Sequence, residues 1–227
     1  MKRINLICSM TLIICLMFAS CETIQNTSSG VKGGVIGTGA GAAVGAGVGA
    51  LAGNTALGAV IGGVVGGTAG ALIGHKMDKQ RKELEKIEGA TVESVNSGEA
   101  IKVTFDSGIL FATGKSDLSA VSKTSLSKFA ASLAANPQTN VQIFGHTDNT
   151  GTDNINIPLS QQRAASVQFY LMQQGIAANR MSAAGKGSSE PVADNSTTAG
   201  KTQNRRVEIY ILANEQMIQD AHQGSLR

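Results

Sequence analysis

The order of apolar and polar positions divides the chain into a glycine-rich N-terminal part and a C-terminal part with the pattern of a folded domain. In the C-terminal part, apolar and polar residues alternate over 100–105 and 207–211, and short apolar runs cover 141–144 and 181–184, which predicts strands. Apolar residues recur every three or four positions over 119–136, which predicts an amphipathic helix, and a second helix is expected over 158–174. The order β-α-β-α-β-β predicts an α+β fold over residues 100–213, with a mixed sheet and helices on one face.

Regularly spaced glycines dominate residues 33–75. Two sets of five stand four residues apart: Gly37, Gly41, Gly45, Gly49 and Gly53, then Gly58, Gly62, Gly66, Gly70 and Gly74. This spacing places each set on one face of a helix, where bare backbone lets another helix approach closely. We expect a glycine-zipper helical hairpin that turns at Asn54-Thr55, because the runs interleave Val, Ile, Leu and Ala, whereas a flexible linker would be rich in serine. The pattern leaves open whether the hairpin inserts into membrane lipid or packs against copies of itself as a homo-oligomer.

Polar segments lie around these two parts. Residues 21–32 are expected to be a short tether. Residues 76–99 are expected to form an exposed charged helix and a linker, since Asp78/Lys82 and Arg81/Glu85 place opposite charges four residues apart. Residues 214–227 are expected to be a loose or helical tail.

Residues 1–20 have the pattern of a signal peptide, because Lys2 and Arg3 precede a long apolar stretch. The stretch ends in Phe18-Ala19-Ser20-Cys21, and small residues before a cysteine resemble the bacterial lipobox, in which the cysteine becomes the first residue and is lipidated. We therefore expect lipidation of Cys21. The alternative is a plain signal peptide that leaves Cys21 as a free thiol.

Composition narrows the class of protein further. Cys8 and Cys15 leave with the signal peptide, so the mature chain has no internal disulfide to offer. Of the 19 basic residues, Lys2 and Arg3 also leave, and the remaining 17 face 16 acidic residues. This balance excludes a basic nucleic-acid-binding protein.

Four short blocks in the C-terminal part are more specific. They are Gly145-His146-Thr147-Asp148-Asn149-Thr150-Gly151, Asn156-Ile157-Pro158-Leu159-Ser160-Gln161-Gln162-Arg163-Ala164, Gly185-Lys186-Gly187, and Asn204-Arg205-Arg206-Val207-Glu208. In order and spacing the blocks resemble the OmpA-like peptidoglycan-binding domain, and the resemblance covers residues 100–213. Together with the lipobox and the glycine-rich segment, they make the chain similar to the lipoprotein branch of that family, of the YiaD type, rather than to its porin branch.

The resemblance implies binding of the diaminopimelate residue of the peptidoglycan stem peptide through Asp148 and Arg163. The chemistry agrees, because diaminopimelate offers an ammonium and a carboxylate on one carbon, and Arg163 can hold the carboxylate with two parallel hydrogen bonds while Asp148 accepts the ammonium. Spacing alone favours a structural ion pair between Asp148 and Arg163, whereas the resemblance favours ligand binding.

Five further residues are expected at or near this site. Thr147 and Asn149 belong to a turn whose backbone N–H groups can face the ligand, and the helix that starts at Pro158 would point its positive end at the same region. Asn156 is expected to cap or brace the loop. Arg205 and Arg206 alternate across the last strand, so only one of them can face the ligand.

The resemblance implies no enzymatic activity, and no cofactor is expected. His75, His146 and His222 are too scattered for a metal cage, and His146 is expected to support its turn. One departure from the family pattern concerns the first motif, in which an acid often follows the phenylalanine, whereas Ala112 follows Phe111 here.

These expectations describe an outer-membrane lipoprotein whose C-terminal domain lies in the periplasm. The lipid on Cys21 would hold one end, and peptidoglycan would hold the other without a covalent bond. The main alternative is a glycine-zipper membrane protein whose role is oligomerisation or pore formation. A cell-wall hydrolase is a third, less favoured reading.

Overall fold

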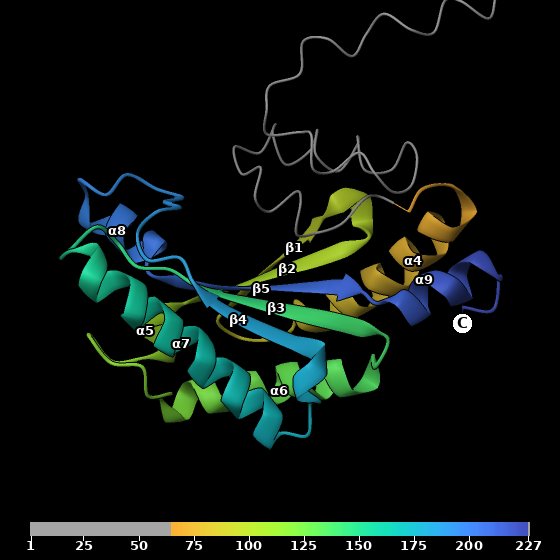
Figure 1. Cartoon of the computed structure of the whole chain (residues 1–227), viewed down its shortest axis with the longest axis horizontal. Helices are drawn as coiled ribbons and strands as arrows, with labels where there is room; N and C mark the ends of the chain where they lie inside the picture. Colours follow the sequence, from red (N-terminus) through yellow and green to blue (C-terminus); the bar gives the residue numbers. More distant parts are fainter. Residues whose placement is uncertain (1–64, 227) are drawn as a thin grey trace, which may run out of the picture.

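Five strands form one sheet in the computed structural model, which describes residues 65–226 (Figure 1). They are β1 (Ala90–Val95), β2 (Ala100–Asp106), β3 (Thr139–Gly145), β4 (Met181–Gly185) and β5 (Arg206–Ala213), in the order β1-β2-β5-β3-β4. Neighbouring strands are antiparallel, except that β3 and β4 are parallel. This arrangement confirms the predicted α+β fold with a mixed sheet.

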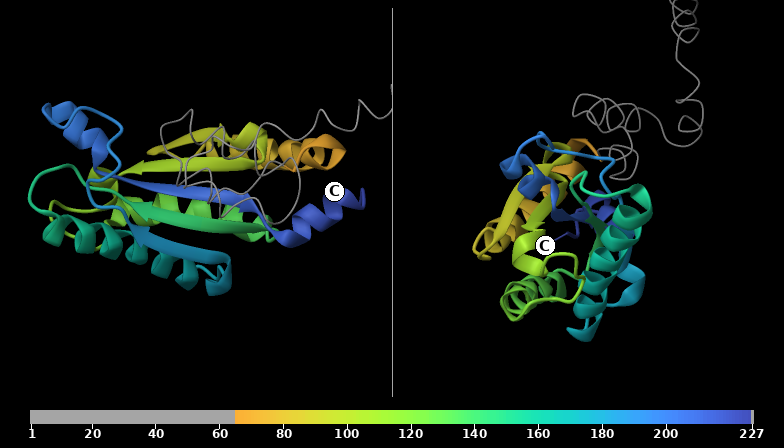
Figure 2. Two further views of the ribbon diagram at one scale, coloured as in Figure 1. Left: turned by 45° about the horizontal axis from the view of Figure 1, so that its top comes forward. Right: turned by 90° about the vertical axis from the view of Figure 1, so that its left-hand side faces the viewer.

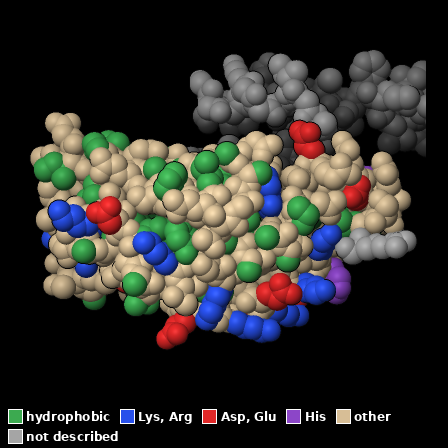
Figure 3. All heavy atoms as spheres, turned by 90° about the horizontal axis from the view of Figure 1, so that it is seen from below, with side chains coloured by type: hydrophobic (Ala, Val, Ile, Leu, Met, Phe, Trp, Pro, Cys, Tyr) green, Lys and Arg blue, Asp and Glu red, His purple; other side chains and the backbone are tan. Residues whose placement is uncertain are grey.

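Helices cover one face of the sheet (Figures 1 and 2). They are α4 (Gly67–Leu84), α5 (Ser107–Leu110), α6 (Ala120–Ala135) and α7 (Asp153–Gln173). Helices α8 (Thr198–Asn204) and α9 (Glu215–His222) lie at opposite ends of the sheet, and short 3-10 turns occur at Asn96–Gly98 and Ala178–Arg180. Helices α4, α6 and α7 supply the core on that face. The outer sides of α6 and α7 carry the exposed apolar residues Val121, Phe169 and Met172, and Figure 3 shows apolar side chains interspersed with charged ones on this face.

The core follows from the alternation seen in the sequence. Val103 and Phe105 of β2 are fully buried towards the helices, and the Phe105 ring meets that of Phe129 on α6 edge to face, with centroids 6.1 Å apart. Ser119 begins α6, because its side chain accepts a hydrogen bond from the backbone N–H of Ser122. The helix ends just before Pro137, as expected.

The folded unit extends further towards the N-terminus than residue 100. Helix α4 runs without a break across the expected boundary at residues 75 and 76, and its Ile73, Met77 and Leu84 are buried in the core. Strand β1, within the segment expected to be a linker, pairs with β2 from Ala100 to Phe105. In the expected tail, α9 buries Met217. The charged residues of α4 are therefore one exposed side of an amphipathic helix, and the other side is core.

The last glycines of the zipper pattern contact this same unit. The Glu99 carboxylate accepts hydrogen bonds from the backbone N–H groups of Val65 (2.8 Å) and Gly66 (3.3 Å), and so caps α4 from a distant loop. A Cβ atom at Gly70 would lie 2.6 Å from a Glu99 oxygen. Gly70 therefore allows the start of α4 to approach the turn between β1 and β2.

Helix α7 lies directly on the ends of β3 and β4 because two glycines leave room for it. A Cβ atom at Gly145 would lie 2.2 Å from the carbonyl oxygen of Ser160, and one at Gly185 would lie 2.4 Å from the backbone nitrogen of Gln161. Both neighbours are helix backbone, which cannot move aside locally. These glycines therefore set the position of the α7 segment that carries Arg163.

Several predictions fall on residues outside the described part of the chain. They are the signal peptide (1–20), the tether with Cys21 (21–32) and the zipper hairpin up to residue 64. Within residues 65–226, no helix combines the length and apolar character needed to cross a membrane.

The contact between α7 and the strand ends can be tested with Gly145→Ala in the mature chain. We expect a loss of about 3 kcal/mol in the free energy of unfolding, because the added methyl group overpacks a contact between backbones. Gly74→Ala is the matched control, since its Cβ atom would meet nothing closer than 3.9 Å. The control should gain about 0.5–1 kcal/mol from better helix propensity. Urea unfolding measures both, and equal stabilities for Gly145→Ala and the wild type would refute the packing argument.

Candidate functional site

Asp148 lies in the loop that follows β3 and is 6% exposed. Its Oδ2 atom is 2.6 Å from Nη1 of Arg205, and its Oδ1 atom accepts a hydrogen bond of 2.8 Å from the backbone N–H of Thr150. Burial raises the pKa of Asp148, but the hydrogen bonds from Arg205 and Thr150 lower it more, so the pKa lies below its usual value. Asp148 is therefore ionised at neutral pH.

Arg163 lies on α7 and is 4% exposed. Its Nε donates a hydrogen bond of 3.0 Å to the backbone oxygen of Lys115, and its guanidinium lies over the ring of Phe111, 5.2 Å from the centroid. Within residues 65–226, no carboxylate oxygen lies within 4.0 Å of it. Burial and the positive charge of Arg205 lower the pKa of Arg163, while Asp148 raises it. Arg163 is thus a buried cation with no carboxylate partner in the described part of the chain.

The structure decides how the charges pair. Asp148 and Arg163 do not form the direct ion pair that spacing alone favoured, because Arg205 pairs with Asp148 instead. All three side chains are close enough for their charges to act on one another. Arg205 is also held by Thr202, whose Oγ1 accepts a hydrogen bond of 2.7 Å from Nη2.

The turn residues lie beside these charges. The backbone N–H of Thr147 donates to the Gly187 carbonyl at 2.8 Å, and Thr147 Oγ1 is buried with no hydrogen-bond partner among the described residues. Asn149 is exposed, and its backbone N–H donates to the side chain of Asn195. Asn156 is buried and donates through Nδ2 to the backbone oxygen of Asp148 at 3.4 Å, so it braces the loop as expected.

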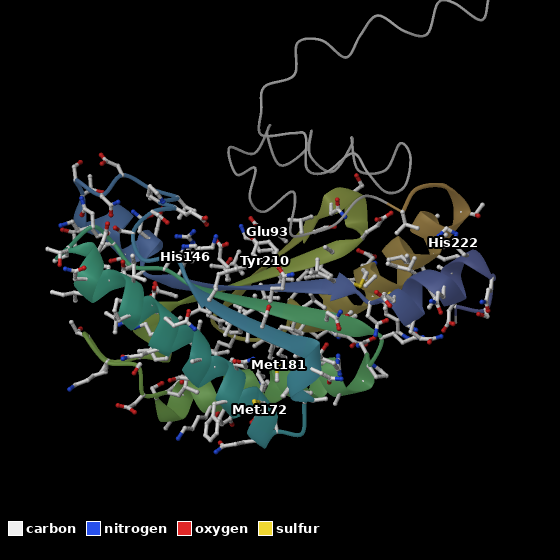
Figure 4. The ribbon with its side chains drawn as sticks, in the orientation of Figure 1. Glu93, His146, Met172, Met181, Tyr210 and His222 are labelled. Carbon is white, nitrogen blue, oxygen red and sulfur yellow. The ribbon has the colours of Figure 1, made fainter. Side chains whose placement is uncertain are left out.

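Arg206 does not reach this site. Its Nε donates to Glu208 at 2.7 Å, and the other oxygen of Glu208 accepts the Tyr210 hydroxyl at 2.9 Å. His146 lies beside this group, with Nε2 3.8 Å from Glu208. Figure 4 shows His146 and Tyr210 on the side of the sheet away from α6 and α7. The position of Arg206 therefore does not support the prediction that it belongs to the ligand site, because its guanidinium contacts Glu208 and not Asp148 or Arg163.

The start of α7 also differs from the prediction. The helix begins at Asp153, so Pro158 lies inside it rather than at its first position. Proline has no N–H, so the hydrogen bond to the backbone oxygen of Asn154 is missing in the second turn of α7. The positive end of α7 is therefore at Asp153 and not at Pro158.

Sequence reasoning missed the residues that hold the site together. Asn204 is fully buried, and its side chain accepts from the backbone N–H groups of Val192 and Ala193 and donates to Asn195. Ser160 Oγ accepts from the backbone N–H of Gly187 at 2.9 Å. The sequence did place both residues inside the four blocks, but their partners come from loops that only the folded chain brings near.

No metal site is evident in the part of the chain that the structure describes, because residues 65–226 contain no group of three or more His, Cys, Asp or Glu side chains placed to hold an ion. An open surface pocket of about 620 Å³ lies on the face of the sheet away from α6 and α7. Its lining includes Glu93, Lys102, Thr104, Arg206 and Glu208. It does not include Asp148 or Arg163.

Comparisons with known proteins agree with this fold. Residues 110–205 match the model of the OmpA family, and residues 1–78 match that of the YMGG-like Gly-zipper. The chain is 39% identical over 140 residues to the probable lipoprotein YiaD of Escherichia coli, covering 61% of this chain and 64% of that protein. It is 48% identical over 86 residues to the peptidoglycan-binding protein ArfA of Mycobacterium tuberculosis, covering 38% of this chain and 26% of that protein.

A solved structure gives the same result. The cell wall anchor of the T6SS from Pseudomonas aeruginosa is 30% identical, with a TM-score of 0.53, and the alignment covers 61% of this chain and 97% of that one. The fold and the sequence blocks thus define an OmpA-like domain. Through this domain the chain is similar to the OmpA family over residues 110–205, and its residues 1–78 are similar to the YMGG-like Gly-zipper. The matches to YiaD and ArfA span less than two thirds of those proteins.

The buried histidine beside the site predicts a pH dependence of stability. His146 is 1% exposed, and burial, together with the charge of Arg206, lowers its pKa from 6.5 to about 4. The unfolded chain therefore binds a proton near pH 6.5 that the folded chain binds only near pH 4. Stability should fall by up to about 3 kcal/mol as the pH drops through this window.

His146→Phe removes this titration while keeping a planar ring. Urea unfolding at pH 7, 5.5 and 4 should show a smaller loss of stability for the variant than for the wild type. Identical losses would mean that other groups, chiefly carboxylates, cause the acid sensitivity.

Proposed function

We propose that this protein is an outer-membrane lipoprotein that binds peptidoglycan without a covalent bond, through the diaminopimelate residue of the stem peptide. The observation that carries the proposal is Arg163, a buried guanidinium with no carboxylate partner within the described residues, next to the ionised Asp148. A buried charge is stable only when it is paired. A carboxylate from outside the chain would provide the missing partner.

The geometry suits an amino-acid head group. Nε of Arg163 is already bound to the Lys115 carbonyl, and the Phe111 ring covers one face of the guanidinium, so the terminal nitrogens are the ones left to hold a carboxylate. Asp148 would accept the ammonium of the same head group. The loop from Thr147 to Asn149 lies alongside, and the buried Thr147 hydroxyl has no hydrogen-bond partner among the described residues.

The relatives support the same class of ligand. The mycobacterial relative carries the name peptidoglycan-binding protein, and the matching solved structure is described as a cell wall anchor. Peptidoglycan that contains diaminopimelate has a free carboxylate on this residue. Peptidoglycan that contains lysine at the same position lacks it, so the site would distinguish the two types.

The N-terminal part supplies the membrane end of the proposal. Cys21 follows a lipobox-like sequence, and the Escherichia coli relative is named a probable lipoprotein. Glu22 follows Cys21, so the aspartate associated with inner-membrane retention is absent from that position, which favours the outer membrane. The lipid would then anchor one end of the chain and the wall would hold the other, with no chemical turnover.

A second function is suggested by the match of residues 1–78 to the YMGG-like Gly-zipper. In that case oligomerisation or pore formation would be the main role, and wall binding would serve only to position the protein in the cell envelope. Wall binding by the folded part alone separates the two. The fragment to use begins at residue 65, because α4 belongs to the core.

The site predicts a loss of wall binding in Arg163→Ala. Without the guanidinium, the ligand carboxylate stays desolvated and unpaired, so binding should weaken by roughly 2–4 kcal/mol, or about 30- to 1,000-fold. Asp148→Ala should act similarly through the ammonium. Sedimentation with purified diaminopimelate-type peptidoglycan measures the loss, with lysine-type wall as the comparison ligand.

The control for these variants is Lys123→Ala, which removes one positive charge from an exposed position on α6. It should bind as the wild type does. Circular dichroism checks that all variants are folded. A folded Arg163→Ala variant that sediments as well as the wild type would show that the site is elsewhere.

The membrane anchor predicts the behaviour of Cys21→Ala. This variant should lose labelling by radioactive palmitate and should accumulate as unprocessed precursor, because lipidation and cleavage both depend on that cysteine. Labelling and membrane fractionation of cells measure both effects. Palmitate labelling that persists in the variant would exclude Cys21 as the lipidated residue.

A further inference from the structure

The charges at the site do not balance. Asp148, Arg163 and Arg205 act on one another electrostatically, and together they carry one net positive charge. A ligand with one ammonium and one carboxylate is neutral, so it would leave that excess in place. A ligand with one more carboxylate would remove it.

Arg205 also occupies the place that a ligand ammonium needs. Its Nη1 lies 2.6 Å from Oδ2 of Asp148, and the other carboxylate oxygen already accepts the Thr150 N–H. Both oxygens of Asp148 are thus engaged in the free protein. An ammonium that binds Asp148 has to share it with Arg205 or displace Arg205 from it.

Displaced from Asp148, Arg205 would still remain at the site. Nη2 is held by Thr202 Oγ1 at 2.7 Å, on α8, and this contact does not involve Asp148. The side chain of Arg205 is 37% exposed whereas that of Asp148 is 9% exposed, so Arg205 lies on the open side of the pair. A guanidinium in this position can meet a carboxylate that approaches from solvent.

We propose that Arg205 exchanges partners when the ligand binds. It releases Asp148 to the ligand ammonium and pairs with a second ligand carboxylate, outside the head group that Arg163 holds. The site would then select stem peptides whose other carboxylates are free over peptides in which they are carboxamides. This inference rests on the proposed function and adds to it the class of stem peptide that is bound.

The test compares two synthetic tripeptides, alanyl-γ-glutamyl-diaminopimelate with all carboxylates free, and the same peptide with the carboxylates outside the diaminopimelate head group converted to carboxamides. Calorimetry with the mature chain in detergent should give tighter binding of the free acid by about fivefold, as for a partly exposed ion pair. Arg205→Gln should bind the two peptides within about twofold of each other.

The affinity of Arg205→Gln for the carboxamide peptide distinguishes partner exchange from a general loss of folding. Arg205→Gln should bind the carboxamide peptide at least as well as the wild type does, because Asp148 no longer has to be released. A misfolded variant would lose both peptides. Arg205→Lys should restore part of the preference. Lys123→Gln removes the same charge from an exposed position on α6 and should leave the preference unchanged.

Each outcome has one meaning. A wild-type chain that binds neither peptide contradicts the proposed function itself. A wild-type chain that binds both peptides equally, or an Arg205→Gln variant that keeps the preference for the free acid, overturns the partner exchange while leaving diaminopimelate binding intact.

Discussion

The backbone contact between α7 and the ends of β3 and β4 is the constraint on which the rest of the site depends. Gly145 and Gly185 have no side chain, so the helix backbone around Ser160 sits against the strands at a distance that even a methyl group would prevent. This brings α7 to the edge where the loop after β3 begins. Arg163, less than one turn beyond Ser160, is then buried beside Asp148.

Because the charges at this edge are buried, their pairing affects the stability of the protein and its affinity for a ligand. Arg163 is removed from water, yet among the described residues its partners are only a carbonyl and an aromatic ring, both weaker than a carboxylate. Asp148 is also buried, but Arg205 and a backbone N–H satisfy it. In the folded chain the carboxylate of Asp148 is therefore paired, whereas the guanidinium of Arg163 has no carboxylate partner among the described residues. Such an arrangement destabilises the free protein slightly and favours an anionic ligand.

On the other face of the sheet, buried charged residues are paired within the chain. Arg206, Glu208 and Tyr210 satisfy one another directly, so this buried group needs no ligand for stability. Arg205 and Arg206 are neighbours in sequence, yet one borders the proposed ligand site and the other lies in this network. The strand alternation predicted that they would separate, but it could not say which of the two would face Asp148.

The sequence by itself predicted the strands β2 to β5 and the helices α6 and α7, because apolar periodicity and capping residues act locally. It also indicated the resemblance to the OmpA family, through four blocks that include Asp148 and Arg163. It did not reveal that α4 and β1 belong to the core, since the charged residues of α4 hide a buried side that carries Ile73, Met77 and Leu84. Only the tertiary structure decided that Arg205 rather than Arg163 pairs with Asp148. Ion pairing depends on distances between side chains from separate elements, and those distances exist only once the close packing of α7 has been made.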